Sequence, residues 1–235
     1  INNLVFLAQE SGRPVQANYL CQAEGKASVN QQIASLAMLF KNYIRPLGLK
    51  SLSLPCLLFG TGMAFPWSLI EKLNFATGNI VEDTQLGIDC VCLGYPPMYC
   101  EDVLVGSYFP SMQDAEKTQR TRWEHGHLKT LFTRVPVLLS YSIIKRDRNL
   151  LFLAFEVGVP PLSLLVLLQF LVGIVLITSG MFVGSLCLLI TGFLPLVSLL
   201  LIITFAWVSF GRDVLPLKYF LIIPWYIVKK IPLYL

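Results

Sequence analysis

Charged residues are scarce in this sequence. Only 14% of the 235 residues are Asp, Glu, Lys or Arg, against about 25% in average soluble domains, while 55% are apolar. Between Arg148 and Arg212 the single charged side chain is Glu156. This composition excludes an ordinary soluble protein, and we expect an integral membrane protein with a water-soluble part.

Several site signatures are also missing. The six cysteines show no C-x-x-C spacing, and five of them precede residue 149, so free and mostly buried thiols are expected rather than a zinc site. The sequence Gly60-Thr61-Gly62 lacks both the G-x-G-x-x-G spacing and a following Gly-Lys-Ser/Thr, which argues against dinucleotide and Walker-type sites. No basic patch is interleaved with aromatic residues, so nucleic acid is not an expected partner.

The long apolar stretch predicts two membrane spans, from about 150 to 177 and from about 181 to 210, which form a transmembrane α-helical hairpin that turns at 178–180. The turn carries no charge, whereas cations flank both spans. The positive-inside rule therefore places residues 1–149 and the C-terminal end in the cytoplasm. The flanking cations are Lys145, Arg146, Arg148, Arg212, Lys218, Lys229 and Lys230.

A third apolar segment, 215–235, is broken by three prolines and by Lys229-Lys230. It is either an interfacial helix or the start of a third span, and the sequence leaves both open. At the other end, the chain begins with Ile1 and shows no signal peptide, so we expect a fragment that starts in mid-domain.

Residues 1–149 read as an α/β domain, because strands and helices alternate along the chain. We predict that residues 98–108 hold one or two short strands. The other expected elements are a strand at 14–20, a helix from Ile33 to Ile44 stopped by Pro46, a short helix from Pro66, and a helix at 82–93 closed by Gly94.

Three short motifs carry chemistry, and each has a plain structural alternative. Gly60-Thr61-Gly62 can bring backbone close to a ligand, but a tight turn explains it equally well. Glu82-Asp83 begins a predicted helix, whose dipole would keep Asp83 an anion able to accept a proton from an alcohol. Capping of that helix would also explain an acid at this position.

The third motif is Gln119-Arg120-Thr121-Arg122-Trp123. On a helix Gln119, Arg122 and Trp123 are at i, i+3 and i+4, so an amide, a guanidinium and an indole share one face. Such a face suits a phosphorylated sugar, since a guanidinium binds phosphate oxygens and an indole stacks on a sugar ring. The alternative is the solvated basic helix of an ordinary domain.

Taken in this order and followed by membrane spans, the motifs Gly60 to Phe65, Val81-Glu82-Asp83 and Gln119 to Trp123 resemble family 2 glycosyltransferases of the cellulose synthase and poly-N-acetylglucosamine synthase type. Val15 to Tyr19 also resembles the strand that follows the metal-binding D-x-D segment of that family. The resemblance covers nearly the whole chain and implies a GT-A type nucleotide-sugar fold, of which the donor-binding half is absent.

The resemblance implies a role for each motif. Asp83 would be the general base that deprotonates the acceptor hydroxyl, and Glu82 would lie near the acceptor. Arg122 would lie near the diphosphate, Trp123 beneath the acceptor sugar, and Gln119 beside them on the floor of the site. Gly60, Thr61 and Gly62 would border the acceptor site.

The resemblance also implies the substrates and the cofactor. They are a nucleotide-sugar donor, a polysaccharide or lipid-linked acceptor, and a divalent metal, Mg or Mn, held by the absent D-x-D segment. No residue present here is expected to bind the metal, so the full-length enzyme would be active and this fragment inactive. A bacterial inner membrane is the expected location.

Some questions stay open at this stage. His125 and His127 point about 200° apart on a helix, which favours interfacial or solvent-facing side chains over a metal site. Glu156 would lie near the cytoplasmic end of the first span, where it could face interfacial water or pair with Arg148 or Arg212. A non-catalytic membrane subunit or transporter component with a partner-binding soluble domain remains the alternative function.

Overall fold

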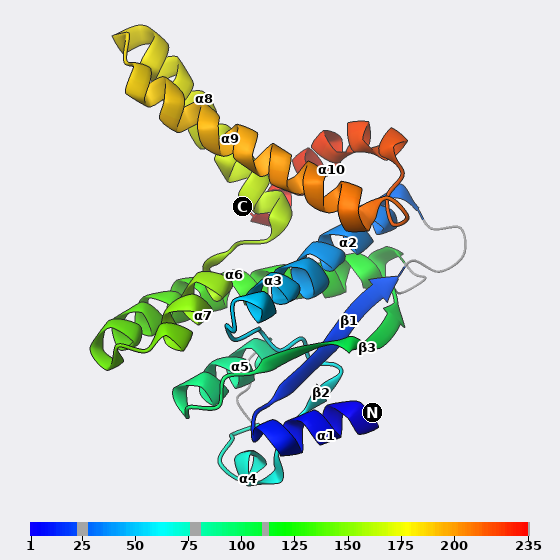
Figure 1. The fold of residues 1–235 in the computed structure, drawn as a ribbon. Helices are drawn as coiled ribbons and strands as arrows, with labels where there is room; N and C mark the ends of the chain where they lie inside the picture. Colours follow the sequence, from blue (N-terminus) through cyan, green and yellow to red (C-terminus); the bar gives the residue numbers. More distant parts are fainter. Residues whose placement is uncertain (23–27, 76–80, 110–112, 235) are drawn as a thin grey trace. The chain divides into compact units, whose positions relative to one another are not determined.

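The structure, a computed structural model, describes residues 1–22, 28–75, 81–109 and 113–234 (Figure 1). The chain divides into two compact units, Ile1–Pro160 and Pro161–Leu235. The first is mostly helical and contains a small mixed sheet, and the second consists of helices.

The sheet of the first unit has the strand order β2-β1-β3. β1 (Val15–Gln22) pairs in parallel with β3 (Met98–Tyr108) and antiparallel with the short β2 (Met63–Ala64). The register of β1 and β3 shifts after Ala17, so that Asn18 lies opposite Leu104. The strand predicted at 14–20 is confirmed, and residues 98–108 form one strand.

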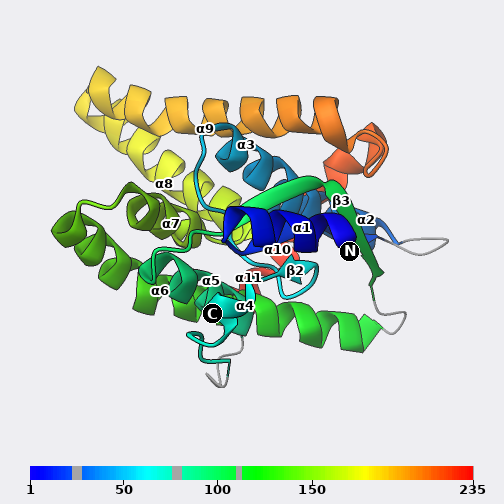
Figure 2. The same ribbon diagram turned by 60° about the horizontal axis from the view of Figure 1, so that its bottom comes forward.

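Helix α1 (Asn2–Ser11) packs on one face of this sheet (Figure 2). Leu4 and Ala8 of the helix are buried against Val15, Ala17 and Cys100. Because side chains alternate along a strand, Gln16 and Asn18 face the opposite side of β1. That opposite side is where the candidate site lies.

The helix predicted from Ile33 to Ile44 continues past Pro46, which corrects the expectation that this proline stops it. Helix α2 (Val29–Leu39) passes through a π-helical turn, η1 (Phe40–Ile44), into α3 (Arg45–Ser51). Pro46 has no N–H to donate to the carbonyl of Asn42, which is one turn earlier. The buried hydroxyl of Tyr99 donates to that carbonyl at 3.2 Å and so compensates for the missing bond.

The next helices, α4 (Trp67–Ile70) and α5 (Glu82–Cys92), follow the predicted pattern, and Gly94 at φ 86° comes just after α5 as expected. Helix α6 (Gln113–Lys145) lies beside α7 (Arg148–Gly158) in both views (Figures 1 and 2). The two pack with α5 around one apolar core. Its buried members are Leu57, Ile88, Val91, Leu138, Leu150, Leu153, Ala154 and Val157.

The first long apolar helix starts later than the predicted residue 150, because α7 precedes it as a separate helix. Leu150, Leu153, Ala154 and Val157 are buried in the core of the first unit, and the helix ends before Pro160-Pro161. Each proline disfavours the helical conformation of the residue before it, so the long apolar stretch is divided here. The next helix, α8 (Leu162–Val183), begins only after Pro161.

The second unit is built on α8 and α9 (Leu186–Ala206), which run antiparallel and pack closely. A Cβ on Gly173 would lie 2.5 Å from Leu196 Cδ1, and one on Gly180 would lie 3.0 Å from Leu189. Glycine at these positions therefore sets the distance between the helices. The predicted turn at 178–180 is inside α8, because the helix ends instead at Gly184, whose φ of 67° suits a glycine C-cap.

Two helices are long and apolar enough to cross a membrane, Leu162–Val183 and Leu186–Gly211. The second combines α9 with a π-helical turn, η2 (Trp207–Gly211). Apolar side chains on both are widely exposed, among them Phe182, Phe193 and Phe205. A helix that is apolar on all sides and unburied suits lipid better than water.

The segment after residue 215 forms three short helices, each preceded or opened by a proline. They are η3 (Leu217–Ile222), α10 (Ile223–Lys229) and α11 (Ile231–Tyr234). The Tyr234 and Ser163 hydroxyl groups lie 2.7 Å apart, which ties this segment to the start of α8. None of the three helices approaches the roughly 20 residues that a membrane span requires.

Candidate active site

The loop Gly60-Thr61-Gly62 is held in place by Gln16, a fully buried residue of β1. The Gln16 Nε2 group donates to the carbonyl of Thr61 at 2.9 Å, and its Oε1 accepts from the N–H of Phe59 at 2.8 Å. The backbone of β1 adds a third bond, from the N–H of Ala17 to the carbonyl of Gly62 at 2.8 Å. One amide side chain thus fixes the loop on the strand, a role that sequence reasoning missed.

Both glycines of the loop are required by geometry. Gly60 has φ 76° and Gly62 has φ 70°, a region that other residues rarely adopt. A Cβ on Gly62 would lie 2.9 Å from Val105 Cγ2, so this glycine packs against the sheet. A Cβ on Gly60 would lie 3.3 Å from Oδ2 of Asp83, so the loop and the start of α5 are in direct proximity.

Asp83 lies in the first turn of α5 and is half-buried, whereas its neighbour Glu82 is exposed. The N-cap residue is Val81, which has no side-chain cap, and Asp83 Oδ1 accepts from the N–H of Thr84 at 2.7 Å. Burial raises the pKa of Asp83, while the nearby Lys41 ammonium and the Thr84 N–H lower it. A carboxyl group with a raised pKa is a better proton acceptor than an ordinary aspartate.

Gln119, Arg122 and Trp123 lie in the first half of α6, as the motif predicted a helix there. Gln119 and Arg122 are exposed and Trp123 is half-buried. None of the three makes a hydrogen bond or ion pair with another residue of the described ranges. Their side chains are therefore available to a ligand.

Lys41 lies on the π-helical turn η1. Its side chain is exposed, yet the protein around it lowers its pKa by removing hydration, with opposing contributions led by Asp83. Arg45 lowers this pKa further, and Glu156 and Glu124 raise it.

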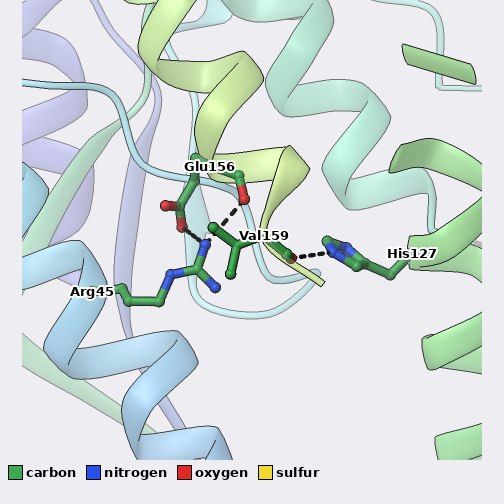
Figure 3. A network of polar contacts seen from close by, with 4 residues as sticks. All are labelled: Arg45, His127, Glu156 and Val159. Atoms are coloured by element: carbon green, nitrogen blue, oxygen red, sulfur yellow. Dashed lines mark hydrogen bonds and ion pairs between the residues drawn. The ribbon is translucent and has the colours of Figure 1, made fainter. Parts of the chain in front are cut away.

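A network of polar contacts supports this region (Figure 3). The Arg45 Nη2 group lies 2.8 Å from Glu156 Oε1 and donates to the Glu156 carbonyl at 3.0 Å. Glu156 therefore pairs with Arg45, and not with Arg148 or Arg212, which were the partners considered from the sequence. The pair joins α3 to the end of α7, so Glu156 is a structural anchor of the first unit.

The two histidines behave differently. His125 is exposed, as expected, but His127 is half-buried and its Nε2 lies 2.9 Å from the Val159 carbonyl (Figure 3). Burial, with a smaller contribution from Lys41, lowers the pKa of His127 to about 4. His127 is therefore neutral at pH 7 and donates to the Val159 carbonyl, so of the two expected alternatives, interfacial or solvent-facing, the solvent-facing one is wrong for this side chain.

Metal ligation was tested on the side chains in the described ranges. No group of three or more His, Cys, Asp or Glu among them could hold a metal ion. The cysteines are free thiols, and Cys56 and Cys90 are buried, which raises the pKa of each to about 12. The described residues therefore do not fit the divalent metal that the resemblance implies.

Comparison with known proteins gives the family of the chain. A family model described as glycosyl transferase family group 2 matches residues 12–211. No curated protein and no solved structure was found to match the chain. The matched region contains the Gly60 loop, Asp83, the Gln119–Trp123 segment and both long apolar helices. Since this match extends over most of the sequence, the chain belongs to glycosyl transferase family group 2.

Proposed function

We propose that this protein is a membrane-bound inverting glycosyltransferase, which moves a sugar from a nucleotide-sugar donor to a polysaccharide or lipid-linked acceptor at the cytoplasmic membrane face. Family membership supports glycosyl transfer between a nucleotide-sugar donor and an acceptor in general. We also propose that the first unit is part of a GT-A type domain, and that its three-stranded sheet is part of the central sheet of that domain.

One observation carries the proposal. Asp83 is a half-buried carboxyl group with a raised pKa, and it directly adjoins the glycine loop at Gly60. Glycine leaves space beside the carboxylate, because any side chain at position 60 would contact Asp83 Oδ2. An acceptor hydroxyl can therefore approach a proton acceptor there, and the family supplies the reaction that needs one.

In the proposed reaction Asp83 takes the proton of the acceptor hydroxyl while the hydroxyl oxygen attacks the anomeric carbon of the donor sugar. The new bond joins this oxygen to that carbon, and the bond from the carbon to the diphosphate oxygen breaks. The nucleoside diphosphate leaves with the electron pair. Attack opposite the leaving group inverts the configuration of the anomeric carbon.

The remaining predicted site residues have substrate-binding roles in this proposal. Arg122 carries an exposed guanidinium that can bind diphosphate oxygens, and Trp123 offers an indole face to the acceptor sugar. Gln119 supplies an amide beside them, and Glu82 an exposed carboxylate near the acceptor. A divalent metal, Mg or Mn, would aid departure of the diphosphate and would be held by other residues than those described.

The proposed membrane placement follows from charge and hydropathy. Helices α8 and α9 would span the bilayer, with the cations Lys145, Arg146 and Arg148 on the cytoplasmic side before α8. The uncharged connection at Gly184-Ser185 would lie on the opposite side. Two exposed native cysteines can report this topology, since Cys92 belongs to the first unit and Cys187 follows the connection.

A membrane-impermeant maleimide tests the placement on intact and inverted vesicles. We expect Cys187 to react from the outer side and Cys92 only from the cytoplasmic side. The reaction is run at alkaline pH, because burial and Asp89 raise the pKa of Cys92. Labelling of both cysteines from the same side contradicts the proposed topology.

The activity itself is tested with the full-length protein in its membrane and labelled nucleotide sugars. We expect release of nucleoside diphosphate together with a product of inverted anomeric configuration, measured by NMR. Retained configuration, or the absence of transfer from every donor tried, contradicts the proposal. Product length separates the two acceptor types, since products that stop at one added sugar exclude polymerisation.

A further inference from the structure

The C-terminal segment of the second unit connects the ends of its two long apolar helices. The second of these helices ends at Gly211. At the other end of the segment, the Tyr234 and Ser163 hydroxyl oxygens lie 2.7 Å apart, and Lys230 Nζ donates to Ser163 Oγ at 3.4 Å. Because the two helices are antiparallel, the start of α8 and the end at Gly211 lie on the same side of the pair. Residues 212–234 therefore run along that one end of the helix pair (Figure 1).

The beginning of the segment is held on the end of the second apolar helix. Trp207 Nε1 donates to the Leu215 carbonyl at 2.8 Å, and Leu215 is fully buried. The Trp207 ring lies edge-on to the Phe220 ring, with 4.8 Å between the centroids. Together with the bonds to Ser163, these contacts give the segment a fixed inner side.

The outer side of the segment is apolar. Leu221, Trp225, Val228 and Pro232 occur at i, i+4, i+7 and i+11 along η3, α10 and α11, so they share one face of this helical path. All four are exposed, Leu221 to 89% and Trp225 to 60%. An exposed face of this kind marks a protein or membrane interaction site.

Cations accompany this face and lie over aromatic rings. Lys218 Nζ is 5.0 Å from the centroid of the Tyr219 ring, and Lys229 Nζ is 5.3 Å from that of Trp225. Both lysines are exposed, and residues 212–235 contain four cations and one acid. Trp and Tyr rings are enriched at the boundary between bilayer and water, and cations there attract anionic headgroups.

We infer that residues 212–234 lie flat in the bilayer interface, with Leu221, Trp225 and Val228 in the acyl boundary, and that Lys218 and Lys229 bind the phosphate groups of anionic phospholipids. This inference rests on the proposed membrane placement of α8 and α9. A lipid surface fits better than a protein partner, because both ends of the segment are attached to helices that would lie in lipid. An interfacial helix also needs only one apolar face, whereas a span needs about 20 apolar residues.

Spin labelling of the full-length protein tests the depth of the segment in vesicles of phosphatidylcholine and phosphatidylglycerol. The nitroxide is attached to Leu221→Cys or, as the matched control, to Asp213→Cys, after the exposed Cys92 and Cys187 have been changed to serine. We expect the label at position 221 to lie about 5–10 Å deep and the label at position 213 to lie in water. Equal access of a water-soluble nickel complex to both labels would overturn the inference. A label at position 221 near the bilayer centre would also overturn it, since the segment would then be a third span.

Native mass spectrometry tests the preference for anionic lipid, with phosphatidylglycerol and phosphatidylcholine titrated separately onto the full-length protein. In Lys218→Met/Lys229→Met we expect the preference for phosphatidylglycerol to fall about 25-fold, about fivefold for each lysine. Lys50→Met/Lys72→Met is the matched control, because it removes two ammonium groups that are bonded within the first unit. The control should keep the wild-type preference. An unchanged preference in Lys218→Met/Lys229→Met, or an equal loss in the control, would overturn the headgroup assignment.

These outcomes are separate from those that test the proposed function. Neither the label depth nor the lipid preference depends on sugar transfer, so absence of transfer in the wild-type protein would refute the proposed function alone. An active enzyme whose label at position 221 lies in water would overturn this inference alone.

Discussion

Replacement of Gln16 by methionine tests how the candidate site is built. Methionine is also unbranched and of similar size, so the core around residue 16 stays filled. The change removes the two short side-chain bonds to the loop, from Nε2 to the Thr61 carbonyl and from the Phe59 N–H to Oε1, together with the longer one from Nε2 to the Gly62 carbonyl at 3.5 Å. It leaves both backbone groups without their partner.

The expected cost follows from these bonds. A polar group left unsatisfied in the interior costs about 1–3 kcal/mol, and the two here are only partly buried, so we expect about 2–4 kcal/mol in total. Since about 1.4 kcal/mol is a factor of 10, the loop should open about 30- to 700-fold more often. Glycosyl transfer should fall as well, because Gly60 adjoins Asp83.

Hydrogen exchange measured by mass spectrometry on the full chain in detergent is the assay. The amides to follow are Phe59 and Ala17, since the Ala17 N–H is bonded to the Gly62 carbonyl. Gln9→Met on the exposed face of α1 is the matched control and should leave the exchange unchanged. Exchange in Gln16→Met within about threefold of wild type would refute this account of the loop.

Three further changes address the surroundings of the site. Glu156→Gln or Arg45→Met breaks a largely buried ion pair and should lower the free energy of unfolding of the first unit by about 2–4 kcal/mol, measured as a lower Tm. Lys50→Met, which breaks an exposed pair, should lower it by about 1 kcal/mol or less. Equal effects of the two changes would contradict the anchor role of Glu156. Burial lowers the pKa of His127 from 6.5 to about 4, so the unfolded chain binds more protons between these values and stability should fall as pH drops from about 6.5 to about 4. His127→Gln should lose less stability over that range, and identical Tm-against-pH slopes would count against a buried neutral histidine. Gly62→Ala should lower the free energy of unfolding by about 2–4 kcal/mol, because φ is 70° and the new Cβ would lie 2.9 Å from Val105. A Tm equal to that of wild type would contradict this and show that the loop adapts.

The sequence predicted β1, β3 and α5 well, because local signals there agree with packing. In α5, the acidic first turn and Gly94 mark both ends. Helix α1 and the two-residue strand β2 were not predicted. The roles assigned to the glycine, acidic and aromatic residues of the motifs stay predictions.

Features that depend on distant partners could not be predicted in this way. Pro46 suggested a helix end, but Tyr99, 53 residues later, supplies the missing bond to the Asn42 carbonyl. Glu156 suggested a membrane-embedded acid, but Arg45 pairs with it across 111 residues. The apolar residues of α7 resembled the start of a span because a core helix and a membrane helix share the same composition.

Gln16 illustrates the same limit within the site. It lies in the Val15–Tyr19 segment that resembles the family, but nothing in that segment predicts that its side chain holds the Gly60–Gly62 loop. A polar residue at position 16, between the apolar Val15 and Ala17, was the one available signal, since a buried amide implies a bonding partner.

The central claim is that Asp83 accepts the proton of the acceptor hydroxyl, and Asp83→Asn in the full-length enzyme tests it most directly. Asn keeps the size of the side chain but cannot accept the proton, so transfer should fall by at least about 100-fold at saturating donor and acceptor. Asp89→Asn on the same helix, where Asp89 accepts from Gln85, is the matched control and should stay near wild type. An Asp83→Asn enzyme that keeps wild-type transfer would contradict the account.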